Sequence, residues 1–149
     1  VYAEIMFGLE LVIPEKAGRE ERCATILAEL ELDGSSNPFN LSRGERQRVA
    51  LASVLARKPD LLILDEHTAA LDPRSSENVM ALTRHIVEEK NITTLMVTHN
   101  LKFAVQYGDR LIMMHRGQMV LDITGTEKSQ LNIKDLTEKF DEISIEDGN

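Results

Sequence analysis

Short apolar runs alternate with helical patterns from residue 41 onward, and this alternation limits the folds open to the chain. Strands that are almost continuously apolar and separated by helices are typical of a parallel sheet. We therefore expect an α/β fold in which a mainly parallel sheet is covered on both faces. The expected strands are 61–65, 93–99, 110–115 and 118–124, and the expected helices are about 43–57, 74–90, 101–107 and 132–140.

The last two expected strands are separated only by Arg116 and Gly117. A two-residue connection that contains glycine is a hairpin signal, because both turn residues need a left-handed backbone. We expect an antiparallel pair here, at the edge of the sheet.

The first forty residues show no strand pattern and read as a small helical subdomain. Cys23, Ile26, Leu27 and Leu30 repeat at the spacing of one helix face. We divide the chain into this subdomain (1–40), an α/β lobe (41–125), and a C-terminal helix with an acidic tail (126–149).

Composition excludes several classes of protein. No apolar run approaches the roughly 20 residues that cross a bilayer. The net charge of −8 argues against a nucleic-acid surface, so we expect no nucleic-acid partner. The single cysteine, Cys23, cannot form a disulfide within the chain.

Polar side chains stand where two expected strands end. Asp65 and Glu66 close the first strand, and His99 closes the second. Ligands of open parallel sheets bind at this edge. A carboxylate suits Mg²⁺, and a second acid can take a proton from water. The plainer interpretation is two hydrated acids and a histidine that caps the next helix.

The segment NLSRGERQ carries a second candidate site. Ser42 and Glu45 have the spacing of a capping box, so a helix should begin there. The start of a helix attracts anions, and Gly44 would let a phosphate approach closely. The plainer interpretation is a well-capped amphipathic helix with a solvated basic face.

Four motifs in this order resemble the ATP-binding cassette (ABC) ATPases: LSRGE, then LLILD followed by Glu66, then ALDP, then TH. The resemblance extends over nearly the whole chain and implies a P-loop NTPase-like fold. It implies that Leu41, Ser42, Gly44 and Glu45 form the signature motif, which contacts ATP held by a partner domain.

The same resemblance implies roles for the strand ends. Asp65 would hold Mg²⁺, which in the family is usually a contact through water, and Glu66 would be the general base. Residues 70–72, ending at Asp72, would form the D-loop, which crosses the dimer interface. His99 would be the switch histidine that faces the γ-phosphate.

Three residues depart from the family pattern. Arg43 replaces the first glycine of the signature, and we expect its side chain to point away from the phosphate. Glu45 replaces the common glutamine and adds a negative charge beside an anion site. His67 stands where proline is usual, and we interpret it as a neutral variation in a tight turn.

The phosphate-binding P-loop pattern, GxxxxGK[ST], is not found, since none of the eight glycines precedes a lysine. In the family this loop lies upstream of the helical subdomain. We therefore expect the chain to be the C-terminal part of an ABC ATPase domain, inactive in isolation because half of each ATP site is missing.

The resemblance implies an ATP-hydrolysing ABC transporter subunit, with ATP and Mg²⁺ as cofactors. The expected partners are a second ABC ATPase domain, paired head to tail, and membrane-spanning permease subunits. The expected location is cytoplasmic, on the inner face of the cell membrane. An importer of the amino-acid or tryptophan type fits the LDEHTAALDP segment. The alternatives are a non-transport ABC ATPase of DNA repair or ribosomes, and a non-catalytic interaction module.

Overall fold

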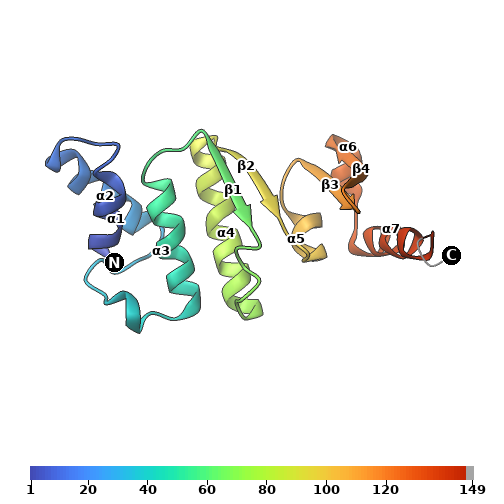
Figure 1. The fold of residues 1–149 in the computed structure, drawn as a ribbon, viewed down its shortest axis with the longest axis horizontal. Coiled ribbons are helices and arrows are strands. Elements are labelled where there is room, and N and C mark those ends of the chain that lie inside the picture. The colour runs from blue at the N-terminus through green and yellow to red at the C-terminus, as the bar shows by residue number, and fades with distance from the viewer. Residues whose placement is uncertain (147–149) are drawn as a thin grey trace. The chain divides into compact units, whose positions relative to one another are not determined.

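The computed structural model describes residues 1–146, which form two compact units (Figure 1). The first unit is Val1–Val97, and the second begins at Thr98. The first contains α1 (Tyr2–Leu9), α2 (Lys16–Glu29), the 3₁₀ turn η1 (Pro38–Asn40), α3 (Arg43–Leu55), β1 (Leu61–Asp65), α4 (Pro73–Lys90) and β2 (Thr93–Val97). The second contains α5 (Leu101–Gln106), β3 (Arg110–His115), β4 (Gln118–Thr124), α6 (Gly125–Gln130) and α7 (Ile133–Glu146).

The helical pattern of the first forty residues is confirmed. Cys23, Ile26 and Leu30 are fully buried and share one hydrophobic core with Ile5 and Leu9 of α1. Leu27 is only half-buried and packs at the margin of that core. The subdomain division at 1–40, 41–125 and 126–149 stays a prediction.

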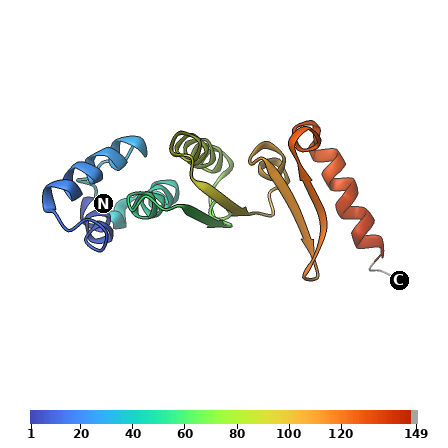
Figure 2. The same cartoon turned by 90° about the horizontal axis from the view of Figure 1, so that it is seen from above.

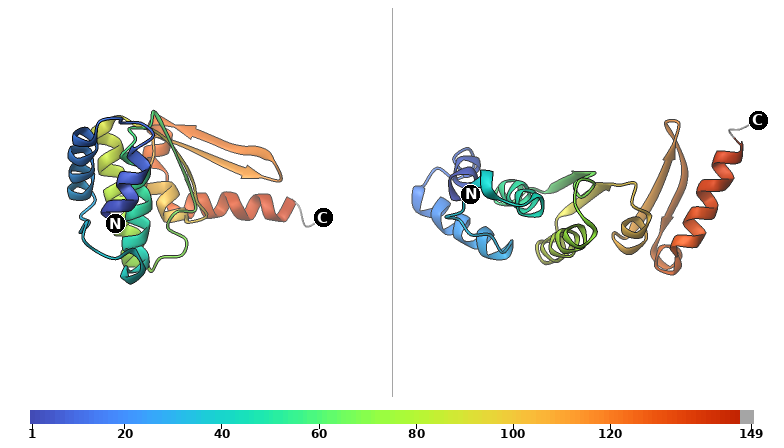
Figure 3. Two further views of the ribbon diagram at one scale, coloured as in Figure 1. Left: turned by 60° about the vertical axis from the view of Figure 1, so that its left-hand side comes forward. Right: turned by 90° about the horizontal axis from the view of Figure 1, so that it is seen from below.

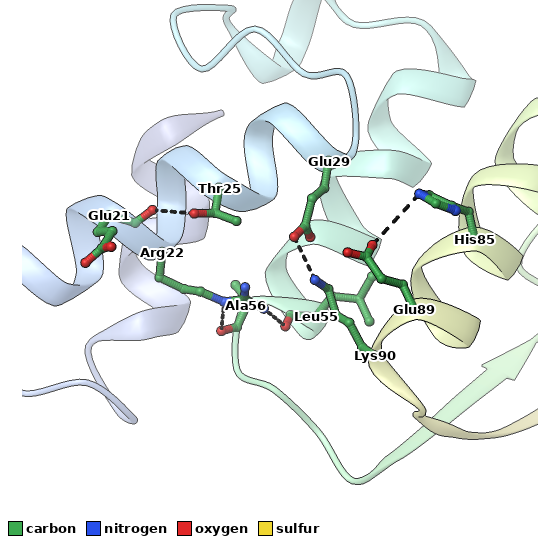
Figure 4. A network of polar contacts seen from close by, with 9 residues as sticks. All are labelled: Glu21, Arg22, Thr25, Glu29, Leu55, Ala56, His85, Glu89 and Lys90. Carbon is green, nitrogen blue, oxygen red and sulfur yellow. Dashed lines mark hydrogen bonds and ion pairs between the residues drawn. The ribbon is translucent and has the colours of Figure 1, made fainter.

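Polar contacts fasten α2 to the helices that follow it (Figure 4). Arg22 donates from Nε to the carbonyl of Ala56 and from Nη2 to that of Leu55, at 3.1 and 2.9 Å. These carbonyls lie at the C-terminal end of α3, where no further turn of the helix supplies donors, so a guanidinium is a fitting cap. The Leu55 carbonyl also accepts from the N–H of Lys58 at 3.0 Å. Lys90, at the end of α4, forms an ion pair of 2.7 Å with Glu29. The helical lobe is therefore attached to α3 and to α4.

The strands β1 and β2 pair in parallel, with Leu61 opposite Thr93 and Asp65 opposite Val97. Alternation along β1 puts Leu62 and Leu64 into the core, with side chains of α3 and α4. Figure 2 shows α4 lying along one side of this pair of strands.

The opposite face of this sheet is open, which corrects the expectation that both faces are covered. Leu61, Ile63, Leu95 and Val97 are between 48% and 61% exposed. The register sets these side chains together on one face. Both faces of these strands are apolar in sequence, but the helices of the first unit pack on only one of them.

The second unit is an antiparallel hairpin with helices packed on it (Figure 3). The expected hairpin is confirmed: Arg116 and Gly117 form the turn between β3 and β4, both with positive φ. The expectation that this pair forms the edge of the parallel sheet is wrong, because β3 and β4 make a two-stranded sheet of their own. Leu111, Met113 and Ile123 face a small core that Leu136 of α7 completes.

The helix α6 was not predicted from the sequence. Its segment, GTEKSQ, has no apolar face, and the residue that it buries is Lys128. The Lys128 ammonium donates to the carbonyl of Val105, and burial lowers its pKa. A lysine that buries its aliphatic stem and donates to a carbonyl does not produce the apolar spacing by which a helix is predicted from sequence.

Among the described residues, no helix combines the length and the apolar character that crossing a membrane requires.

The open face of β1 and β2 predicts self-association of the chain. Each apolar side chain that leaves water contributes roughly 25 cal/mol per Å², so the chain should form larger species as its concentration rises. Ile63→Thr keeps a β-branched residue in the strand but removes apolar surface, and it should shift the population toward monomer in sedimentation experiments. Val54→Ala, at an exposed position of α3, is the control. Wild-type chain that stays monomeric at high concentration would contradict this prediction.

Candidate functional site

The two adjacent acids stand at the carboxyl end of β1. Asp65 is the last strand residue and is exposed. The backbone N–H of Glu66 donates to the carbonyl of Val97 at 3.0 Å, so the ladder to β2 continues one residue further. Glu66 then turns the chain with a φ of 48°. A positive φ is uncommon for a residue with a side chain and is held only by its surroundings.

The loop between β1 and α4 is tied to both elements. The N–H of Ala69 donates to the backbone carbonyl of Glu66 at 2.9 Å, and the N–H of Leu71 donates to the backbone carbonyl of Thr68 at 3.1 Å. Thr68 is buried, and its carbonyl accepts from the hydroxyl of Ser76 on α4 at 3.3 Å. Residues 66–72, which we call the acid loop, therefore have a defined backbone at each end.

Asp72 ends the acid loop as the N-cap of α4. Its Oδ1 accepts from the N–H of Ser75 at 3.0 Å. The hydrogen bonds from Ser75 lower the pKa of the Asp72 carboxyl. Pro73 follows at the first helical position, where its missing N–H has no cost.

The predicted capping box at the start of α3 is confirmed. The N–H of Glu45 donates to the hydroxyl of Ser42 at 3.2 Å, and the N–H of Ser42 donates to the Glu45 carboxylate at 2.8 Å. These bonds to Ser42 lower the pKa of Glu45. Its charge is thus directed at the backbone of Ser42.

Gly44 lies where the first turn of α3 meets the first turn of α4. A Cβ added at Gly44 would come to 3.4 Å from the Cβ of Ser75 and 3.5 Å from its hydroxyl oxygen. The positive ends of two helix dipoles therefore lie next to each other, an arrangement that favours a negative charge nearby.

His67 has more specific surroundings than the sequence suggested. It is half-buried, and its Nε2 is shielded from solvent without a hydrogen-bond partner among the described residues. Burial lowers the pKa of His67. This burial could not be predicted from the sequence, because a histidine in a turn belongs to no periodic pattern.

His99 lies at the start of the second unit, so its grouping with Asp65 and Glu66 stays a prediction. The plainer interpretation, that His99 caps the following helix, is wrong. The N-cap of α5 is Asn100, whose Oδ1 accepts from the N–H of Phe103 at 3.3 Å.

Within the part of the chain that the structure describes, no three His, Cys, Asp or Glu side chains gather as a ready metal site. A Mg²⁺ ion often uses only one or two protein carboxylates, with water and phosphate oxygens as its other ligands. Asp65 at the sheet edge suits that mode of binding.

The sequence matches the family model described as ABC transporter over residues 6–69. This range contains α1, α2, α3 and β1, including Ser42, Asp65 and Glu66. The chain belongs to the ABC transporter ATPase family.

Relatives and solved structures agree with this assignment. The chain is 57% identical over 101 residues to a tyrosine transport ATP-binding protein of Clostridioides difficile, covering 68% of this chain and 40% of that protein. It is 38% identical over 135 residues to the energy-coupling factor transporter ATP-binding protein EcfA2 of Bacillus licheniformis, covering 90% of this chain and 45% of the relative.

Two solved structures show the same fold. The structure of cbiO1 from Clostridium perfringens, part of the ABC transporter complex cbiONQ, has a TM-score of 0.74 at 30% identity. The structural alignment covers 83% of this chain and 50% of the cbiO1 chain. A dimeric post-hydrolysis state of the ATP-binding cassette MJ0796, bound to ADP and Pi, has a TM-score of 0.61 at 32% identity, covering 74% and 48%. The chain thus spans about half the length of the ABC proteins that it matches.

The contact of Gly44 with Ser75 leaves room for a methyl group, so Gly44→Ala should not weaken the fold. Alanine is the better helix former, and we expect the free energy of unfolding to stay within about 0.5 kcal/mol of wild type or to rise. Urea unfolding measures this. Gly108→Ala is the contrast: the φ of Gly108 is +75°, and the change should cost about 1 kcal/mol. A clear loss of stability in Gly44→Ala would mean that α3 and α4 pack more tightly than described.

The lowered pKa of Glu45 predicts a pH dependence of stability. A group whose pKa is depressed on folding stabilises the fold above its unfolded value and loses this contribution as pH falls through the folded value. The ordinary pKa of a glutamate side chain is 4.5. The stability advantage of wild type over Glu45→Gln should therefore hold near pH 7 and shrink as the pH falls below about 4.5. Thermal unfolding of both chains from pH 7 to 3 measures it. A constant difference would contradict the role of the Glu45 charge in the cap.

Proposed function

We propose that the chain supplies the signature, Walker B, D-loop and switch-histidine part of an ATP-hydrolysing ABC transporter subunit. The observation that carries the proposal is the backbone at the end of β1. The bond from Glu66 N–H to the Val97 carbonyl, together with the left-handed turn at Glu66, holds two successive carboxylates at the sheet edge where ligands bind.

The residues fit a complex of ATP and Mg²⁺. Asp65 would hold the metal, which when bound supplies positive charge to the phosphates. Ser42 accepts a hydrogen bond through its oxygen, which leaves its own O–H to donate to a phosphate oxygen. Gly44 lies ahead of the first intrahelical bond of α3, from Arg46 N–H to the Ser42 carbonyl, so its N–H belongs to the group that binds anions.

Glu66 would accept a proton from the attacking water, and His99 would donate a hydrogen bond to the terminal phosphate. A carboxylate suits the first task when its position is fixed relative to the water. The fixed backbone of Glu66 supports that role. The Glu45 charge does not oppose phosphate binding strongly, because its oxygen accepts from Ser42 N–H.

The proposed partners follow from the half-site character of the chain. A P-loop segment would hold ATP in the same domain, and a second ABC ATPase domain would pair head to tail with this one. Membrane-spanning permease subunits would then place the assembly on the cytoplasmic face of the membrane. The 57% identity to a tyrosine transport protein supports an importer of amino acids. No observation favours the DNA-repair, ribosomal or non-catalytic alternatives.

A chimera tests this proposal. The part of the Clostridioides difficile relative that precedes the matched region would be fused to this chain, and MgATP hydrolysis measured. We expect the chain alone to hydrolyse ATP at background rate. We expect the chimera to turn ATP over, and Glu66→Gln to reduce its kcat by about a hundredfold or more, in keeping with loss of a general base.

Glu20→Gln, an exposed position of α2, is the matched control and should leave turnover unchanged. Activity of the chain alone that Glu66→Gln abolishes would contradict the half-site proposal. A folded chimera without activity, or one indifferent to Glu66→Gln, would contradict the assignment of the site.

A further inference from the structure

We infer that Arg43 is a positioning residue that holds the middle of the acid loop against the start of α3. Its Nη1 donates to the carbonyl of Ala70 at 3.4 Å, across a sequence separation of 27 residues. The inference concerns the same site as the proposed function and rests on it for the effect on turnover.

The acid loop is well held at its ends and less so in its middle. Glu66 is bonded to β2, Thr68 is buried under Ser76, and Asp72 caps α4. Ala69 and Ala70 between them are exposed and carry only a methyl group, so side-chain packing contributes little there. The backbone bonds from the Ala69 and Leu71 amides lie within the loop, and the hydrogen bond to the Ala70 carbonyl adds a restraint that comes from α3.

The position of Arg43 in α3 suits this task. It is the first helical residue, and the neighbouring Gly44 lies against Ser75 of α4. The two helix starts are thus close enough for a long side chain on one to reach the loop that leads into the other. A charged donor also makes a stronger bond to a carbonyl than a neutral one.

This contact explains how an arginine can occupy a position beside the proposed phosphate site. Its guanidinium is directed to the acid loop, and the expectation that the side chain points away from the phosphate stays a prediction. A phosphate ligand and a positioning residue have different kinetic consequences. Loss of the former weakens nucleotide binding, whereas loss of the latter lowers turnover with little change in KM.

Hydrogen exchange on the 149-residue chain tests the contact without reference to catalysis. Arg43→Gln should speed exchange of the Ala69 and Leu71 amides by about fivefold, the effect of losing a hydrogen bond of ordinary strength. Arg43→Lys keeps a charged donor and should restore most of the protection. The control is Arg46→Gln, which removes an equal charge from the same helix turn. Arg46 donates to the Leu41 carbonyl instead, so exchange in the acid loop should not change.

The chimera then tests the consequence. Arg43→Gln should lower kcat by about fivefold at unchanged KM for ATP, with rescue by Arg43→Lys and no effect of Glu20→Gln. Wild-type exchange in Arg43→Gln, or a raised KM at constant kcat, would overturn the inference. An inactive parent chimera would contradict the proposed function, and the exchange rates would then decide the role of Arg43 by themselves.

Discussion

The parallel pairing of β1 with β2 is the constraint on which the rest of the first unit depends. Its register places Asp65 opposite Val97, and the next N–H, that of Glu66, donates to the Val97 carbonyl. The pairing also decides which side chains are buried. Leu62 and Leu64 enter the core formed with α3 and α4, and the same alternation leaves Leu61 and Ile63 exposed. One set of backbone hydrogen bonds therefore fixes both the acids and the apolar face.

Around this edge the chain brings two helix starts together. The capping box of Ser42 and Glu45 begins α3, and Asp72 begins α4, each through a side chain that accepts from the backbone. Arg22 satisfies the carbonyls at the other end of α3. The helix that follows the proposed signature residues is thus fixed at both ends.

Much of this could be predicted from the sequence, where local patterns decide the structure. The ends of β1, β3 and β4 agree with the apolar runs, and the turn at Arg116 and Gly117 follows from two positive φ angles. The helix α6 and the surroundings of His67 could not be predicted in this way. Both depend on polar groups that become buried through tertiary contacts. Such burial leaves no periodic spacing of apolar residues in the sequence. The cap of α5 at Asn100 was misjudged because His99 and Asn100 are adjacent and local spacing does not choose between them.

The sequence by itself determined the family and the order of its motifs, because capping, alternation and turn chemistry act over a few residues. Tertiary structure decided what those motifs do to one another. The side chain of Arg43 reaches Ala70, and Gly44 meets Ser75, only because α3 and α4 pack with their starts side by side. Likewise, one face of two apolar strands is covered and the other is open. These outcomes depend on contacts between distant residues, and such contacts follow from packing geometry rather than from local pattern.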